Sequence, residues 1–249
     1  MTRVLLCDAD GCLFPSEEPA FVASAAVTNR LLAELGIDLR FEPDELRAFA
    51  VGKNFRATAI ELAAGRGVAI DGGALEEWVA EERRAVVDHL AAVLRPDPAV
   101  REPLARLAGR FTLTVVSSSA LSRLAACFAA TGLDDLFPPE VRFSAEDSLP
   151  VPTSKPDPAI YALAGERLGV AGDEAVAIED SATGVRSAVA AGFPAIGLVQ
   201  FVPASEREER VAALRAAGAD TVVGSWSEVE ALSRRWRSWS APAARTPAR

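Results

Sequence analysis

Two pairs of acidic residues each follow a short apolar run. Asp8 and Asp10 come just after the first apolar run of the chain, and Glu179 and Asp180 follow a later one. Carboxylates two residues apart in an extended chain project to the same side, so Asp8 and Asp10 could face one crevice. Acid pairs are also common in turns that end strands. Because adjacent buried carboxylates are costly without a cation, Asp8, Glu179 and Asp180 together predict an oxygen-rich site for Mg²⁺.

Hydroxyl and amine side chains lie between these acid pairs in the sequence. The serines at 117–119 follow another apolar run and lead into a helical pattern. Hydroxyls and the free N–H groups of a helix start can bind an anion, although we expect one serine to be an ordinary N-cap. Lys155 precedes Asp157 and Pro158, which are typical of an N-cap and a first helical residue. A lone lysine on a loop is usually solvated, but the neighbouring prolines hold this one stiffly.

These residues need a scaffold that brings the ends of several strands together. Short apolar runs typical of buried parallel strands alternate with helical patterns, which indicates βαβ units. The predicted fold class is therefore α/β, a doubly wound, Rossmann-like parallel sheet, whose ligands bind beyond the carboxyl ends of the strands. The predicted strands are residues 4–7, 111–116, 175–178, 195–199 and 221–223, and the predicted helices are residues 98–108, 121–130, 158–168, 182–191, 204–217 and 228–235.

One stretch, residues 15–94, has helical patterns and no convincing strand. Apolar residues recur at helical spacing over residues 17–35 and 74–94, and Pro43 is typical of the start of a shorter helix. We therefore expect an all-helical insert after the first strand. The predicted domains are an α/β core (1–14 and 95–240), a helical cap (15–94) and a flexible tail (241–249).

Composition limits the possible partners and compartment. The 249 residues carry a formal net charge of −9, and half of them are hydrophobic, which excludes disorder for most of the chain. An acidic surface repels phosphate backbones and anionic lipids, so we expect neither nucleic acid nor a membrane as partner. Three irregularly spaced cysteines, a short N-terminal apolar run and the lack of a long one favour a cytoplasmic protein.

The motifs, taken in order, resemble those of the haloacid dehalogenase superfamily of phosphotransferases. Residues 8–11 (Asp-Ala-Asp-Gly) resemble the first motif, Ser117 the second, Lys155 the third and residues 179–184 the fourth. The resemblance covers about residues 1–223. A helical cap after the first motif is similar to the subgroup that holds phosphoglycolate phosphatases and β-phosphoglucomutases.

This resemblance implies a role for each matching residue. Asp8 would attack phosphorus and become an aspartyl phosphate, and Asp10 would protonate the leaving oxygen and later activate water. Ser117 and Lys155 would hold the phosphoryl oxygens. Mg²⁺ would be the cofactor, and its implied ligands are Asp8, the backbone carbonyl of Asp10, Glu179 and Asp180.

Some positions depart from the family pattern. Cys12 stands where the family usually has threonine, and Pro15 stands where it usually has aspartate. Ala20 takes the place of a histidine typical of β-phosphoglucomutases, and the single histidine, His89, lies far along the insert. The first two departures bear on the hinge that leads to the insert, and the missing histidine counts against a sugar phosphomutase. The residues predicted to bind substrate are Gly52, Lys53, Asn54 and Arg56 in the cap, for which solvated surface positions are the alternative, and Ser118 in the core.

The favoured function is a magnesium-dependent phosphatase acting on a small sugar phosphate or phospho-acid. One alternative is a phosphomutase of the same fold, which would return phosphate to another hydroxyl. Another is a non-catalytic regulator that uses an aspartyl phosphate as a switch. An oxidoreductase is disfavoured because no Gly-x-Gly-x-x-Gly follows a predicted strand. We expect a monomer or a homodimer.

Overall fold

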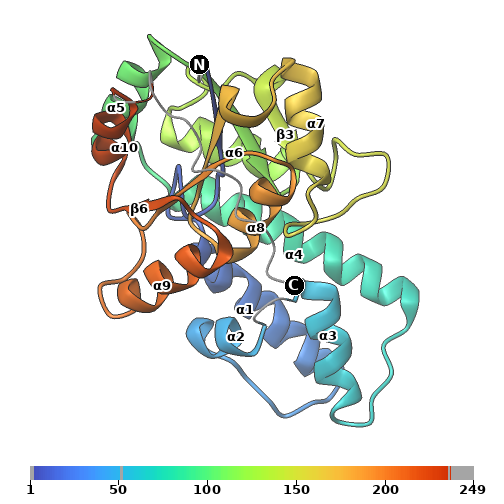
Figure 1. Cartoon of the computed structure of the whole chain (residues 1–249). Helices are drawn as coiled ribbons and strands as arrows, with labels where there is room; N and C mark the ends of the chain where they lie inside the picture. The colour runs from blue at the N-terminus through green and yellow to red at the C-terminus, as the bar shows by residue number, and fades with distance from the viewer. Residues whose placement is uncertain (1–2, 51–52, 235, 237–249) are drawn as a thin grey trace. The chain divides into compact units, whose positions relative to one another are not determined.

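A computed structural model describes residues 3–50, 53–234 and 236 of the chain. The chain divides into two compact units (Figure 1), one made of Met1–Phe14 with Arg95–Arg249 and the other of Pro15–Leu94. The predicted tail at residues 241–249 lies outside the described residues. No helix in the described part of the chain is long and apolar enough to cross a membrane.

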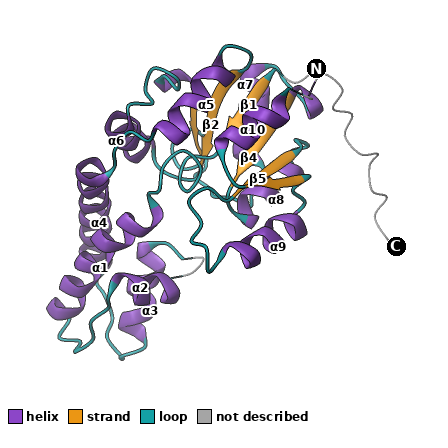
Figure 2. Cartoon of the chain, turned by 90° about the vertical axis from the view of Figure 1, so that its left-hand side faces the viewer, coloured by secondary structure: helices purple, strands orange, loops and turns teal. Residues whose placement is uncertain are grey.

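The first unit is built on a six-stranded parallel sheet (Figure 2). The strand order is β3-β2-β1-β4-β5-β6, so the chain winds outward from β1 to one edge and then from β4 to the other. This order is doubly wound, as predicted, and its switch point lies between β1 and β4. The strands are β1 (Val4–Cys7), β2 (Thr112–Ser117), β3 (Arg142–Ser144), β4 (Ala175–Glu179), β5 (Ala195–Leu198) and β6 (Thr221–Val223).

Helices cover both faces of the sheet. On one face, Leu6 and Ala177 pack with residues of three helices, including Tyr161 and Val185. Residues of alternate register, such as Leu5, are also buried, as expected for strands between two helical layers. The helices of this unit are α5 (Pro98–Ala108), α6 (Leu121–Thr131), α7 (Ala159–Leu168), α8 (Ala182–Ala190), α9 (Arg207–Ala217) and α10 (Trp226–Ser233), with short 3-10 helices at Pro139–Val141 and Gly172–Glu174.

The edge strand β3 was not predicted. It has three residues and begins with the buried Arg142, so it lacks the apolar run that identifies the other strands. The Nε of Arg142 donates to the carbonyl of Phe137 at 2.7 Å, and its guanidinium donates to Asp134 at 2.6 Å. The charge is therefore satisfied locally, which lets an arginine stand in a buried strand position.

The second unit contains four helices and, in its described residues, no strand. They are α1 (Glu17–Glu34), α2 (Pro43–Phe49), α3 (Phe55–Ala64) and α4 (Gly72–Val93). Apolar residues such as Leu31, Ala59 and Leu75 form its core. Pro43 is the first residue of α2, as predicted, since its missing N–H is one that a helix start leaves unpaired. The use of this unit as a cap stays a prediction.

Candidate active site

Asp8 lies at the carboxyl end of β1, where the backbone is held on both sides. Its N–H donates to the carbonyl of Ile178 on β4 at 2.9 Å, and its side chain is almost fully buried. The loop that follows turns back on itself, because the N–H of Leu13 donates to the carbonyl of Ala9 at 2.8 Å. The indole Nε1 of Trp226 donates to the carbonyl of Cys12 at 2.8 Å. The loop is thus fixed by its own turn and by α10.

Gly11 is required in this loop for two reasons. Its φ of +76° lies in the left-handed region, which glycine adopts without strain. A β-carbon at this position would also overlap the carboxylate of Asp180. The close approach between this loop and Asp180 therefore depends on a glycine at this position.

Lys155 joins the ends of three neighbouring strands. Its Nζ donates to Oδ1 of Asp8 at 2.5 Å, to Oε1 of Glu179 at 2.6 Å and to the carbonyl of Val116 at 2.7 Å. The side chain is 5% exposed, so it is not the solvated loop lysine of the alternative hypothesis. Its backbone N–H donates to the hydroxyl of Ser118 at 3.1 Å. Ser118, predicted to bind substrate, therefore supports the loop that carries Lys155.

The balance of charge around Lys155 is negative. Burial raises the pKa of Asp8, Lys155 offsets only part of that effect, and the carboxylates of Glu179 and Asp180 raise the pKa further. Burial by itself lowers the pKa of Lys155, but Asp8 and Glu179 together hold it above its ordinary value. The lysine therefore keeps its proton, and one ammonium does not balance the acids around it.

Glu179 is buried and faces Lys155. Its Oε1 also accepts a hydrogen bond from the hydroxyl of Tyr161 at 2.5 Å. Burial and the neighbouring carboxylates hold the pKa of Tyr161 well above its ordinary value, so the phenol keeps the proton that it donates. The other oxygen, Oε2, lies against Gly184 and has no hydrogen-bond partner among the described residues. The role of Glu179 as a direct metal ligand stays a prediction.

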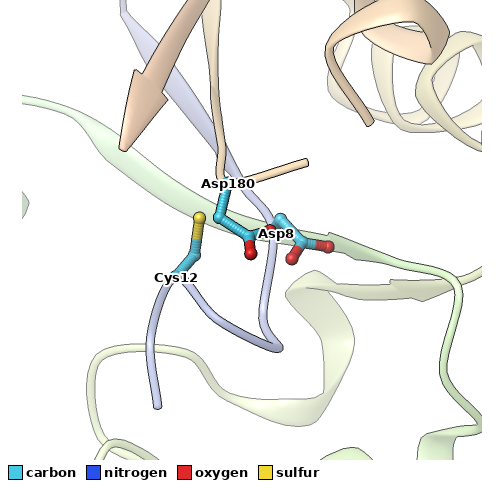
Figure 3. A group of neighbouring side chains, drawn as sticks. All are labelled: Asp8, Cys12 and Asp180. Carbon is cyan, nitrogen blue, oxygen red and sulfur yellow. The ribbon is translucent and has the colours of Figure 1, made fainter. Parts of the chain in front are cut away.

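In the part of the chain that the structure describes, Asp8, Cys12 and Asp180 form a group that could hold a metal (Figure 3). One potential ligand atom from each lies within 4.8 Å of the others. The thiol of Cys12 donates to the carbonyl of Ile178 at 3.6 Å. Burial, and to a smaller extent the nearby carboxylates, raise the pKa of this thiol well above its ordinary value. A protonated sulfur is a poor ligand for a hard cation, so the two aspartates are the suitable donors.

Asp180 also contacts an arginine that the sequence did not identify. Nη1 of Arg210, on α9, donates to the backbone carbonyl of Asp180 at 2.9 Å and lies 3.4 Å from its Oδ2. Ser181 caps α8 as predicted, since its hydroxyl accepts from the N–H of Gly184 at 3.0 Å. Arg210 could not be identified from the sequence, because it is one of several arginines on a polar helix.

Asp10 turns toward the segment after β2. Its Oδ2 accepts from the hydroxyl of Ser119 at 2.7 Å, and its Oδ1 accepts from Arg123 on α6 at 2.7 Å. Its carboxylate is not in the group with Asp8, Cys12 and Asp180. The chain turns only after Asp10, at residues 11–13, and the prediction that Asp8 and Asp10 face one crevice stays a prediction.

The predicted N-caps of two helices differ from those observed. No serine caps α6; the N-cap is Ala120, and the N–H of Leu121 donates to Oδ2 of Asp147 at 2.6 Å. The hydroxyl of Ser117, which is buried, instead accepts from the N–H of Ser119 at 3.0 Å. For α7 the N-cap is Pro158, one residue later than predicted.

The residues predicted to bind substrate in the helical unit have local partners. Asn54 is the N-cap of α3, and its Oδ1 accepts from the N–H of Ala57 at 2.9 Å. Lys53 pairs with Glu61 at 2.7 Å, and Arg56 pairs with Glu76 through both nitrogens of its fork. Gly52 lies outside the described residues. Their role in binding substrate stays a prediction.

Comparison with known proteins now identifies the family. The sequence profile of the haloacid dehalogenase-like hydrolases matches residues 2–192. The chain belongs to this family. Protein CbbY of Cereibacter sphaeroides is 29% identical over 243 residues, which cover 94% of this chain and 96% of CbbY. A CBBY-like protein of Arabidopsis thaliana is 56% identical over 46 residues, which are 18% of this chain and only 14% of that protein.

Solved structures of haloacid dehalogenase-like proteins share the fold. A family hydrolase from Deinococcus radiodurans R1, with bound phosphate and sodium, has a TM-score of 0.67 and 26% identity, covering 95% of this chain and 96% of that one. CbbY from Rhodobacter sphaeroides, in complex with xylulose-1,5-bisphosphate, has a TM-score of 0.69 and 24% identity, covering 92% and 96%. The family predicted from the motifs is confirmed.

Proposed function

We propose that the chain is a magnesium-dependent phosphatase that forms an aspartyl phosphate on Asp8. The observation that carries the proposal is the buried ammonium of Lys155, which holds Asp8 and Glu179 at once. An aspartate fixed at the end of a central strand, with a cation beside it, is suited to attack an electrophile whose oxygens are negatively charged.

The donors present fit a hard divalent cation. Asp8 and Asp180 supply carboxylate oxygens, and the backbone carbonyl of Asp10 is the third protein ligand that we propose. Three buried carboxylates, those of Asp8, Glu179 and Asp180, exceed the charge of Lys155 and the partly exposed Arg210. When bound, Mg²⁺ offsets negative charge on the phosphoryl oxygens.

Two displacements at phosphorus then account for hydrolysis. In the first, a carboxylate oxygen of Asp8 bonds to phosphorus while the ester P–O bond breaks, and Asp10 gives its proton to the leaving oxygen. In the second, Asp10 takes a proton from water as the water oxygen bonds to phosphorus. The bond between Asp8 and phosphorus breaks, and inorganic phosphate leaves. Lys155 and Ser117 are proposed to hold the phosphoryl oxygens in both steps.

The substrate class that we propose is a small phosphorylated metabolite, a sugar phosphate or a phospho-acid. The full-length match to CbbY supports a sugar phosphate, since a CbbY structure is described with xylulose-1,5-bisphosphate. A phosphomutase is the second candidate in this family, but the histidine typical of that pattern is replaced by Ala20. We place the enzyme in the cytoplasm.

The first test uses p-nitrophenyl phosphate with and without Mg²⁺. We expect phosphate release only with the metal, and Asp8→Asn should lower kcat by at least about 10³-fold because an amide is a far weaker nucleophile. Asp173→Asn, on an exposed 3-10 helix, is the matched control and should keep full activity. Intact-mass measurement of acid-quenched wild-type enzyme should show one added phosphoryl group that Asp8→Asn lacks.

Activity retained by Asp8→Asn would exclude Asp8 as the nucleophile. A panel of sugar phosphates and phospho-acids then separates the two candidate functions, with free phosphate and sugar isomers both measured. Isomerisation without phosphate release would favour the phosphomutase and contradict the proposal.

A further inference from the structure

The two carboxylate oxygens of Asp10 have different donors. Ser119 donates its hydroxyl to Oδ2 and Arg123 donates from its guanidinium to Oδ1, each at 2.7 Å. Both donors belong to the segment that follows β2, whereas Asp10 follows β1. The side chains of Asp10 and Arg123 are each 25% exposed, so the pair is neither on the open surface nor fully buried.

The element that carries Arg123 is firmly held. Arg123 lies in the first turn of α6, whose residues Leu124, Cys127 and Phe128 are buried. The helix start is fixed by the bond from Leu121 to Asp147. A charge-assisted hydrogen bond from such a helix restricts the rotation of the carboxyl group that accepts it. A loosely held surface pair would leave that rotation free.

The two donors also differ in what they can do when Asp10 carries a proton. A guanidinium has donors and no acceptor, so Arg123 can only bind an oxygen without a proton. A serine hydroxyl can both donate and accept, so Ser119 can receive a hydrogen bond from a protonated Oδ2. The two oxygens of Asp10 are therefore held in different ways, Oδ1 by a group that can only donate and Oδ2 by a group that can also accept.

We propose that Arg123 is a positioning residue. With Ser119, it holds Oδ2 of Asp10 in the orientation from which Asp10 gives a proton to the leaving oxygen and later takes one from water. This inference rests on the proposed function, since it deepens the role of Asp10 in both displacements. The alternative is that the Arg123–Asp10 pair only fastens α6 to the loop after β1. The two roles differ in how the effect of a substitution depends on the leaving group.

The test compares phenyl phosphate with p-nitrophenyl phosphate, which have nearly the same shape. Phenolate is the more basic leaving group, so its departure depends more on proton transfer from Asp10. We expect Arg123→Gln to lower kcat/KM about tenfold or more for phenyl phosphate and less than about threefold for p-nitrophenyl phosphate. The larger loss is smaller than the about 10²–10⁴-fold that general acid–base catalysis contributes as a whole, because Asp10 itself is still present. Arg123→Lys should restore most of the loss, and Ser119→Ala should show the same leaving-group dependence.

Arg106→Gln is the matched control, because Arg106 forms an exposed ion pair with Glu230 in the same unit. It should leave both substrates unaffected. Equal losses on the two esters in Arg123→Gln, or no loss, would overturn the inference while wild-type turnover and an inactive Asp8→Asn still supported the proposed function. If Arg123→Gln does not fold, Arg123→Lys and Ser119→Ala decide the question by the same ratio. Absence of wild-type turnover on both esters would overturn both proposals.

Discussion

Gly184 occupies a position where any side chain would displace an acid of the site. A β-carbon there would overlap the carboxylate of Glu179, whose Oε1 is already bound by Lys155 and Tyr161. Gly184 lies in the first turn of α8, so the helix brings its backbone directly against the buried carboxylate. The glycine therefore determines where Glu179 lies, and through it where Lys155 lies.

Gly184→Ala should damage stability and activity together. Overpacking in a buried position typically costs about 1–3 kcal/mol, and displacement of Glu179 removes one of the partners that hold Lys155. We expect a lower Tm and a loss of kcat/KM of about tenfold or more on p-nitrophenyl phosphate. Gly72→Ala is the control, because a β-carbon at Gly72 meets nothing within 4 Å. Unchanged Tm and activity in Gly184→Ala would show that Glu179 can move without consequence.

At this scale, the sequence predicted residues that a local pattern marks. Asp8 directly follows the first apolar run, Lys155 lies between prolines, and the structure brings the two together. It did not predict that Glu179 and Asp180 have different partners. Successive side chains along a strand point to opposite sides, so two adjacent acids at its end can contact different groups. Arg123 and Tyr161 were missed because a helical residue carries no mark of what it contacts across the fold.

The helix α10 supports the loop after β1 through a single indole. Trp226 is fully buried, its Nε1 donates to the carbonyl of Cys12, and its N–H donates to Oε1 of Gln200 at 2.9 Å. Its hydrogen bond links the start of α10 to the loop that carries Asp10 and follows Asp8.

Trp226→Phe tests this link, because phenylalanine keeps most of the buried area and lacks the N–H. Leaving the Cys12 carbonyl without its donor should cost about 1–3 kcal/mol in the free energy of unfolding. We expect urea denaturation to show this loss and kcat to fall severalfold. Trp78→Phe, on a partly buried ring in the other unit, is the control and should change stability by less than about 0.5 kcal/mol. A wild-type kcat in Trp226→Phe would mean that the loop holds its own geometry.

Helices and strands were predictable where their buried residues form an apolar run or recur at helical spacing. β1 and β6 have the predicted bounds, and α5 begins and ends as expected. β3 was missed because its first residue is an arginine. Its charge is satisfied by Phe137 and Asp134, which lie outside the strand and are not part of the apolar pattern that marks a strand. The N-cap of α6 was assigned wrongly because Asp147, far along the chain, replaces a local cap.

For the molecule as a whole, the excess of buried acid should appear as a gain in stability on binding metal. A ligand that binds only the folded state stabilises it by about 2.7 kcal/mol at 100 times its Kd. We expect MgCl₂ to raise Tm in wild type and to have little effect in Asp180→Asn, because one of the two suitable carboxylates is lost. NaCl at equal ionic strength controls for screening. An equal rise in both proteins would place the magnesium site elsewhere.

The family and the fold class were predictable from the order of four motifs along the chain, each of which lies where the sheet brings it to the site. The substrate was not predictable from the sequence. Lys53, Asn54 and Arg56 each have a partner within the helical unit, and these contacts explain the three residue types without any substrate. A residue type at a given spacing does not distinguish a helix cap or an ion pair from a contact with substrate.

The central place of β1 has a consequence for synthesis on the ribosome. The first strand to emerge pairs with β2, which ends at residue 117, and with β4, which ends at residue 179. Translation must therefore pass most of the chain before the strand that precedes Asp8 gains its second neighbour, and Trp226 arrives later still. A nascent chain released early would carry Asp8 without the strands and the indole that hold its loop in place.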